Sequence, residues 1–147
     1  MTISRKGLCG IYAAIAVAAL VGTWGNVLDL VSRYGFWEGT VVFWQRTLVN
    51  ESSRFITVDT LFLALAVTVL MVLEARRLEI PGVWVYVVFG LLIAISAAVP
   101  LFMIHRERRL AALTADSAAG TFRAADVLGV GALALVCGAY AAVALSR

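Results

Sequence analysis

Residues 55–74 form an uninterrupted apolar run of the length that crosses a bilayer as a single helix. A carboxylate stands near each end of this run, with Asp59 about one turn inside it and Glu74 at its last position. At a rise of about 1.5 Å per residue, the two acids lie near opposite membrane faces. They cannot share one site. An acidic side chain inside a membrane span is costly and marks a candidate functional site, so the question is which polar groups reach the level of Asp59.

The rest of the chain is apolar enough to lie in a bilayer as well. Hydrophobic residues make up 63% of it, whereas apolar residues make up roughly half of a soluble domain. We expect membrane spans at 8–28, 54–75, 81–104 and 126–145. Residues 1–147 are therefore predicted to form one integral membrane domain of the all-α class, a four-transmembrane-helix bundle.

The segment between the first two predicted spans has the pattern of an amphipathic helix. Its large apolar residues recur at the spacing of one helix face: Trp37, Val41, Trp44 and Leu48, with Phe36 and Phe43 along one edge. We predict a helix over about 36–48 that lies in the membrane interface. It is either a simple anchor or an aromatic lid over the mouth of the bundle.

Small residues repeat every four positions in the first and last spans, as Ala14, Ala18 and Gly22 and as Ala134, Gly138 and Ala142. Such stripes let helix backbones approach closely in lipid. The first and fourth spans are therefore predicted neighbours.

Four crossings would put both termini on one side, so the polar ends of all four spans would meet at the opposite face. This face collects three acids that we interpret as candidate catalytic residues: Asp29, Asp59 and Asp126. It also collects the candidate substrate-binding residues Trp24, Asn26, Tyr34, Trp37, Phe43, Trp44 and His105. Pro100 is expected to kink the third span and open space beside it.

Each of these features also has a simpler interpretation. Trp24, Asn26 and Asp29 are typical of an interfacial belt. His105 is typical of an interfacial residue, and Glu74 of a surface salt bridge with Arg76 or Arg77. The sequence leaves these alternatives open.

Charge and motifs exclude several classes of protein. The 12 basic and 9 acidic residues give a net charge of +3, and the basic residues flank apolar runs, so we expect lipid headgroups and no nucleic acid as partner. Counting basic residues on the two predicted sides gives five against seven, which barely favours a cytoplasmic location for 106–109. With one histidine, no Asp-Asp-x-x-Asp run, and Cys9 and Cys137 in separate spans, we expect no metal site and no cofactor.

Three short motifs carry a family resemblance: the acid within the second span, Glu-x-Arg-Arg at its end, and Pro-Leu-Phe-Met-Ile-His-Arg-Glu over 100–107. They resemble an uncharacterised family of small bacterial membrane proteins, described only as a domain of unknown function. The likeness covers roughly residues 10–110 and leaves the fourth span outside. It implies a bundle in a bacterial cytoplasmic membrane and transfers no activity.

A second, weaker resemblance is to the small integral-membrane terpene cyclases, which are compact helical bundles with essential acids near aromatic residues. It implies acid-initiated cyclisation or isomerisation of a lipophilic, isoprenoid substrate. A neutral acid in a dry pocket can protonate an epoxide or alkene, and aromatic faces stabilise the carbocation. In that hypothesis Asp59 is the acid, Asp29 or Asp126 its partner, and the tryptophans line the pocket.

The alternative hypothesis is a non-catalytic protein, either an accessory subunit of a larger membrane complex or a lipid-binding module. The small-residue stripes suit packing against another copy or another subunit. Intramembrane acids can also serve as structural hydrogen-bond partners.

Overall fold

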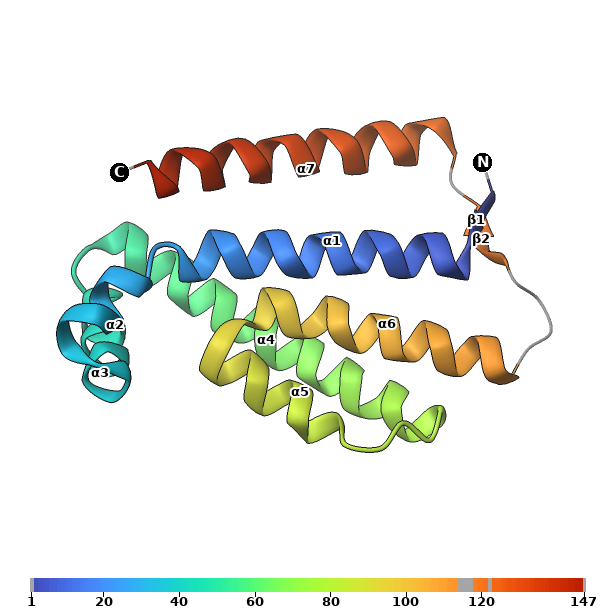
Figure 1. Cartoon of the computed structure of the whole chain (residues 1–147), viewed down its shortest axis with the longest axis horizontal. Coiled ribbons are helices and arrows are strands. Elements are labelled where there is room, and N and C mark those ends of the chain that lie inside the picture. The colour runs from blue at the N-terminus through green and yellow to red at the C-terminus, as the bar shows by residue number, and fades with distance from the viewer. Residues whose placement is uncertain (1, 114–117, 122, 147) are drawn as a thin grey trace.

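The computed structural model describes residues 2–113, 118–121 and 123–146. Helices dominate it, and the predicted all-α class is confirmed (Figure 1). In chain order the helices are α1 Arg5–Trp24, α2 Leu28–Tyr34, α3 Phe36–Arg46, α4 Glu51–Arg77, α5 Val83–Phe89, the π-helix η1 Gly90–Ala94, α6 Ile95–Leu113 and α7 Ala124–Leu145. Two short strands, β1 Thr2–Ser4 and β2 Ala118–Thr121, pair in antiparallel fashion.

Within the described residues, four helices are long and apolar enough to cross a membrane, as predicted: Arg5–Trp24, Glu51–Arg77, Val83–Leu113 and Ala124–Leu145. Local capping explains where two of them begin. The Ser4 side chain accepts a hydrogen bond from the Gly7 amide at the start of α1, and Asn50 accepts one from the Ser53 amide at the start of α4. The helix predicted over 36–48 corresponds to α3, and its interfacial position stays a prediction.

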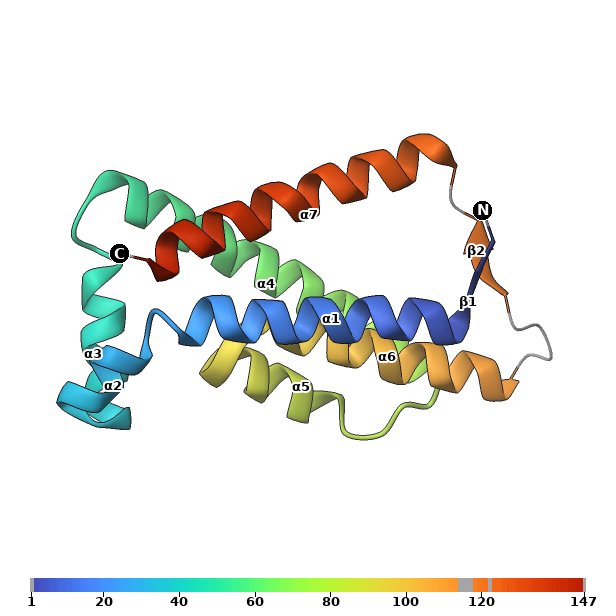
Figure 2. The same ribbon diagram turned by 45° about the horizontal axis from the view of Figure 1, so that its top comes forward.

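The third of these helices folds back on itself. The Tyr86 hydroxyl lies 2.9 Å from Nδ1 of His105, although the two residues are 19 positions apart and a straight helix would separate them by about 28 Å. Figure 2 shows α5 and α6 side by side and antiparallel, joined at η1. The sequence predicted one crossing over 81–104 with a kink at Pro100. The chain instead reverses at Gly90–Ala94, and Pro100 lies inside α6.

Small residues make this reversal possible. A Cβ atom added to Gly90 would stand 3.2 Å from Cβ of Ala98, so the two arms are in close contact. Ala94, Ala97 and Ala98 are buried at the same place. Only glycine and alanine leave room for backbones this close.

Trp24 closes the reversal from the end of α1. Its indole N–H donates to the carbonyl oxygen of Ile93 at 3.1 Å, and its ring stacks on Phe36 with centroids 6.4 Å apart. A backbone carbonyl at a sharp turn in an apolar environment needs a donor, because an unsatisfied polar group there is costly. Trp24 therefore fixes the hairpin of α5 and α6 to α1.

We expect Trp24→Phe to lower the free energy of unfolding by about 1 kcal/mol, because phenylalanine keeps the ring contact and loses the hydrogen bond. Thermal unfolding in detergent micelles measures this loss. The matched control is Trp37→Phe, because the Trp37 side chain is 77% exposed. Equal changes in the two variants would contradict the role of Trp24.

Because of the reversal, the two termini lie at opposite ends of the bundle (Figure 1). At the N-terminal end α1 and α7 begin and α4 and α6 end. Pairing of β1 with β2 joins the starts of α1 and α7, with Thr2 opposite Thr121. The sequence predicted both termini on one side, and the extra change of direction at η1 accounts for the difference.

The first and last spans are neighbours, as their small residues predicted, but through fewer of those residues. A Cβ on Gly22 of α1 would lie 3.5 Å from Cβ of Ala141 on α7. Ala14 and Ala18 are exposed, and a Cβ on Gly138 would meet nothing within 4 Å. Gly25, just beyond α1, likewise lies close to Leu145 at the end of α7, so the described contacts lie at this end of the two helices and do not follow the whole length of the stripes.

The core lies between α4, α5 and α6 rather than under α7. Met71 of α4 and Phe102 of α6 are each only 1% exposed, and Val83 of α5 packs with them. The loop between α4 and α5 adds Leu78 and Ile80 to the same cluster. The described part of α7 has no buried residue.

Candidate functional site

The three acids predicted to be catalytic do not meet. Asp29 on α2 is exposed and forms an ion pair with Arg33 at 2.9 Å. Asp59 on α4 is exposed, and none of the residues described by the structure forms a hydrogen bond or ion pair with it. Asp126 is at the other end of the bundle, where its carboxylate accepts a hydrogen bond from the Arg123 amide at 2.8 Å. The reversal at η1 separates Asp126 from the other two.

The predicted aromatic residues gather at the end opposite the N-terminus, around α2 and α3. Phe36 links Trp24 to Trp37, whose ring centroid lies 5.4 Å from that of Phe36. Phe43 and Trp44 form a second pair at 5.6 Å. All of them except Trp24 are exposed, as is Tyr34.

The side chain of Asn26, at the same end, is bound to the backbone of α1. Its side-chain amide donates to the Gly22 carbonyl oxygen at 2.7 Å, so it closes the last turn of α1. This end of the bundle therefore carries an aromatic surface. It does not enclose the acids.

An ion-pair network centred on the buried Glu107 occupies the N-terminal end, where the sequence predicted only a surface pair. The carboxylate of Glu107 accepts from Arg5 at 2.9 Å and from Arg106 at 2.6 Å, and its side chain is only 4% exposed. Arg106 also binds Glu74 at 2.8 Å, and Arg77 binds Glu74 at 3.2 Å. The network ties α1, α4 and α6 together.

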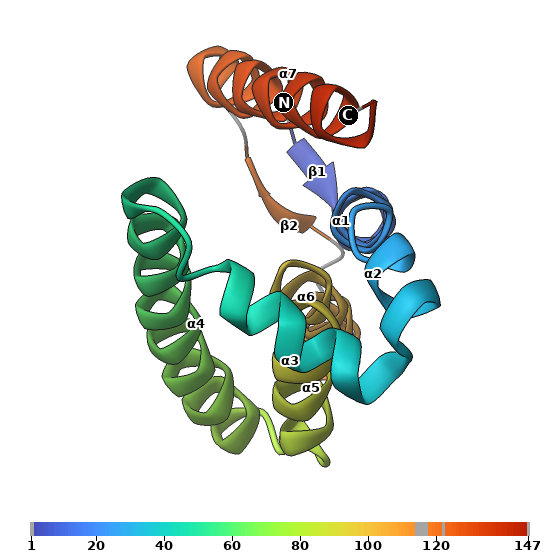
Figure 3. The same cartoon turned by 90° about the vertical axis from the view of Figure 1, so that its left-hand side faces the viewer.

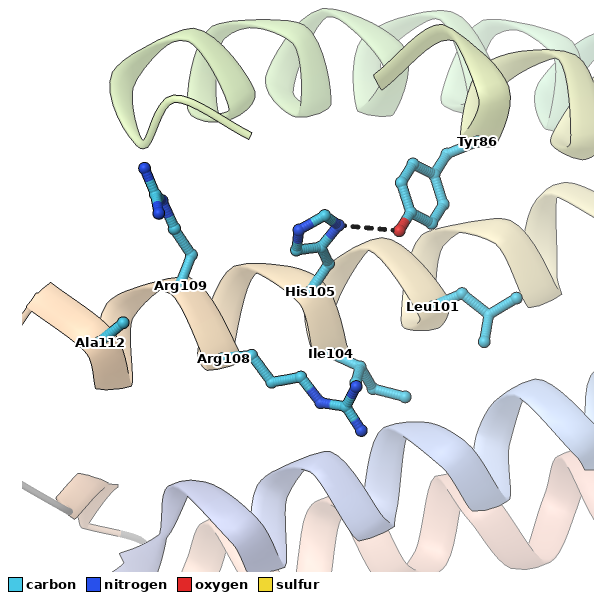
Figure 4. Close-up of a pocket in the computed structure, with 7 residues that line it drawn as sticks. All are labelled: Tyr86, Leu101, Ile104, His105, Arg108, Arg109 and Ala112. Atoms are coloured by element: carbon cyan, nitrogen blue, oxygen red, sulfur yellow. Dashed lines mark hydrogen bonds between the residues drawn. The ribbon is translucent and has the colours of Figure 1, made fainter. Parts of the chain in front are cut away.

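A cavity of about 680 Å³ lies next to this network, on the surface of α6 beside α5. It is lined by Tyr86 of α5 and by Leu101, Ile104, His105, Arg108, Arg109 and Ala112 of α6 (Figure 4). The hydrogen bond between Tyr86 and His105 orients the imidazole on this wall. Of the residues predicted to bind substrate, His105 is the one that lines this cavity.

The two arginines of the cavity differ in what they can bind. Nε of Arg109 donates to the Leu78 carbonyl oxygen at 3.0 Å, and its guanidinium lies 3.6 Å from Glu79. Arg108 is exposed and forms no hydrogen bond or ion pair within 2–113, 118–121 and 123–146. Figure 4 shows the two side chains leaving α6 on different sides. Of the two arginines described on this wall, Arg108 therefore keeps its guanidinium available to a ligand.

The lining of this cavity changes from apolar to basic along α6. Leu101 and Ile104 precede His105, and the two arginines follow within one turn. None of the described residues that line the cavity is a carboxylate. A molecule with an apolar part and an anionic group matches this order of residues, because Arg pairs with carboxylate and phosphate through its planar fork of donors.

A second cavity, of about 540 Å³, is apolar throughout. It is lined by Phe36 of α3 and by Trp84, Val85, Val88, Phe89, Leu92 and Ile93 of α5 and η1. Neither cavity is lined by Asp29, Asp59 or Asp126. This second cavity fits a hydrocarbon chain and offers no acid to act on it.

Cys9 and Cys137 are free thiols, and the described residues contain no group of His, Cys, Asp and Glu that could hold a metal ion.

Three residues that shape the N-terminal end were missed by sequence reasoning: Tyr86, Arg108 and Glu107. A straight third span puts Tyr86 at one membrane face and Arg108 at the other. The small residues at 90, 94, 97 and 98 were the one available indication that this span could reverse.

No curated protein and no solved structure matches the chain. A family model described as "Protein of unknown function DUF2834" matches residues 11–108. The match runs from α1 to the Glu107 network and leaves α7 outside, which agrees with the resemblance over roughly 10–110. The chain therefore belongs to the DUF2834 family, whose function is unknown.

Proposed function

We propose that this protein is a non-catalytic membrane module that binds an anionic lipid or a similar amphiphile in the cavity lined by Tyr86, His105 and Arg108. The observation that supports it most is the uncompensated guanidinium of Arg108 beside apolar Leu101 and Ile104. A lipid phosphate would neutralise the cation while its chains cover the apolar residues.

Most of the arginines near this cavity are already paired with a carboxylate or a carbonyl oxygen. Arg5, Arg106 and Arg77 are bound to Glu107 or Glu74, and Arg109 to Leu78 and Glu79. Arg108 keeps its charge for a ligand. A Lys or Arg near an anionic membrane surface contributes about 1 kcal/mol to its attraction.

The position of the cavity suits a lipid. It lies where α6 passes from apolar residues to the charged N-terminal end, the level at which headgroups meet hydrocarbon. We propose a bacterial cytoplasmic membrane as its location, whose anionic lipids would supply the ligand. The exposed apolar faces of α4 and α7 are open to lipid, to a second copy or to another subunit of a complex.

The enzymatic hypothesis stays a prediction that this geometry favours less. Acid-initiated cyclisation needs a carboxylic acid against a lipophilic substrate. Asp59 is exposed and lines neither cavity described above. An Asp59→Asn variant that loses conversion of an isoprenoid substrate would restore this hypothesis.

The binding proposal is tested with purified protein and two lipids, phosphatidylglycerol and phosphatidylcholine, by native mass spectrometry. We expect preferential retention of phosphatidylglycerol by the wild type. Arg108→Gln should weaken this retention about fivefold, because about 1 kcal/mol of attraction is lost.

The matched control is Arg46→Gln, which removes one positive charge from α3 at the other end of the bundle. It should leave phosphatidylglycerol retention unchanged. Equal retention of the two lipids by the wild type, or an equal loss in both variants, would contradict binding at this cavity.

A further inference from the structure

The two ends of the bundle differ strongly in charge once the reversal at η1 is taken into account. Eight basic residues of the described chain lie at the N-terminal end: Arg5, Lys6, Arg76, Arg77, Arg106, Arg108, Arg109 and Arg123. Three lie at the other end: Arg33, Arg46 and Arg54. The acidic residues of the described chain divide evenly, four to each end, with Glu74, Glu79, Glu107 and Asp126 against Asp29, Glu38, Glu51 and Asp59.

Side-chain contacts fix which segments share the N-terminal end. Arg5 at the start of α1 binds Glu107 near the end of α6, and Arg106 binds Glu74 near the end of α4. Arg109 reaches the Leu78 carbonyl oxygen just beyond α4. The pairing of β1 with β2 brings the start of α7 to the same place (Figure 1).

Figure 3 views the bundle from the other end, where α3 lies across the ends of α5 and α6 and α2 lies beside α1. This end carries the exposed aromatic residues of α3 and few cations. One end of the bundle is therefore basic and the opposite end is aromatic.

We infer that the N-terminal end is the cytoplasmic end, with its basic residues against the anionic headgroups of that leaflet, and that the C-terminus lies across the membrane. Segments rich in Lys and Arg within about 15–20 residues of a span are retained in the cytoplasm. The cytoplasmic leaflet also carries the anionic lipid that attracts them. The straight third span gave five basic residues against seven. That count included Arg147, which lies outside the described residues; for the 11 basic residues that are described, the reversal changes the division to eight against three.

The inference is tested by labelling single cysteines from outside intact spheroplasts with a membrane-impermeant maleimide. In a full-length chain with Cys9→Ala and Cys137→Ala, three positions are compared: Ser52→Cys, Glu79→Cys and Ser146→Cys. Ser52 and Ser146 are exposed at the C-terminal end, and the Glu79 side chain is 86% exposed at the N-terminal end. We expect Ser52→Cys and Ser146→Cys to react in intact cells and Glu79→Cys to react only after permeabilisation.

Each other pattern overturns part of the inference. Labelling of Glu79→Cys alone in intact cells would reverse the orientation. Equal accessibility of Glu79→Cys and Ser146→Cys would remove the reversal itself, because a straight third span puts them on the same side. Labelling all three in sodium dodecyl sulfate verifies that each variant is present. The result does not depend on lipid retention by Arg108, so the two proposals fail separately.

Discussion

Replacing Glu107 by glutamine should lower the free energy of unfolding by about 3–5 kcal/mol, because removing one partner of a buried ion pair leaves buried charge uncompensated. The Glu107 side chain is 4% exposed and that of Arg5 15% exposed. Both Arg5 and Arg106 would lose a carboxylate charge, while the shape of the side chain stays nearly the same. Thermal or denaturant-induced unfolding in detergent micelles gives the difference.

The matched control is Glu79→Gln, which removes a carboxylate from the same end of the bundle. Glu79 is exposed and lies 3.6 Å from Arg109, so its loss should cost less than about 1 kcal/mol. If both variants lose the same free energy of unfolding, the network around Glu107 stabilises the fold no more than a surface ion pair does. A loss confined to Glu107→Gln would show that the network holds α1, α4 and α6 together.

Replacing Gly90 by leucine should cost about 1–3 kcal/mol, because the hairpin of α5 and α6 has no room for a side chain there. The first added atom would stand 2.8 Å from Cδ1 of Ile95 and 3.2 Å from Cβ of Ala98. Ile95 can rotate away, but Ala98 is fully buried on the facing arm. The two arms must separate, which also weakens the hydrogen bond between Tyr86 and His105.

Gly138→Leu on α7 is the control for this change, since a Cβ there meets nothing within 4 Å. We expect it to stay within about 0.5 kcal/mol of the wild type. Unfolding of both variants under the same detergent conditions makes the comparison. Equal stability of Gly90→Leu and the wild type would mean that α5 and α6 do not approach as closely as described.

The helices that depend on local sequence were predictable. Uniform apolar runs predicted α1, α4 and α7, because length and hydropathy alone decide which segments can enter a bilayer. The spacing of Trp37, Val41 and Trp44 predicted α3. These features need no knowledge of the neighbouring helices.

The reversal within 83–113 could not be predicted in the same way. Gly-Leu-Leu-Ile-Ala over 90–94 is apolar throughout and has none of the polar residues that mark turns in a soluble protein. The turn depends on tertiary contacts instead: the indole of Trp24 on the Ile93 carbonyl oxygen, and Ala98 against Gly90. This reversal places His105 and Asp126 at the N-terminal end, so Asp126 does not lie with Asp29 and Asp59 as predicted.

The last helix is joined to the N-terminal end only where it begins, next to the paired strands. α7 contributes no residue to the Met71–Phe102 core, to the Glu107 network or to either cavity. The family match also ends before it. A shortened chain that stops after α6 would keep both cavities and finish on the same side as it began. In the topology inferred above, α7 carries the C-terminus across the membrane, so a tag fused at the C-terminus is expected to report on the compartment opposite the cavity at Arg108.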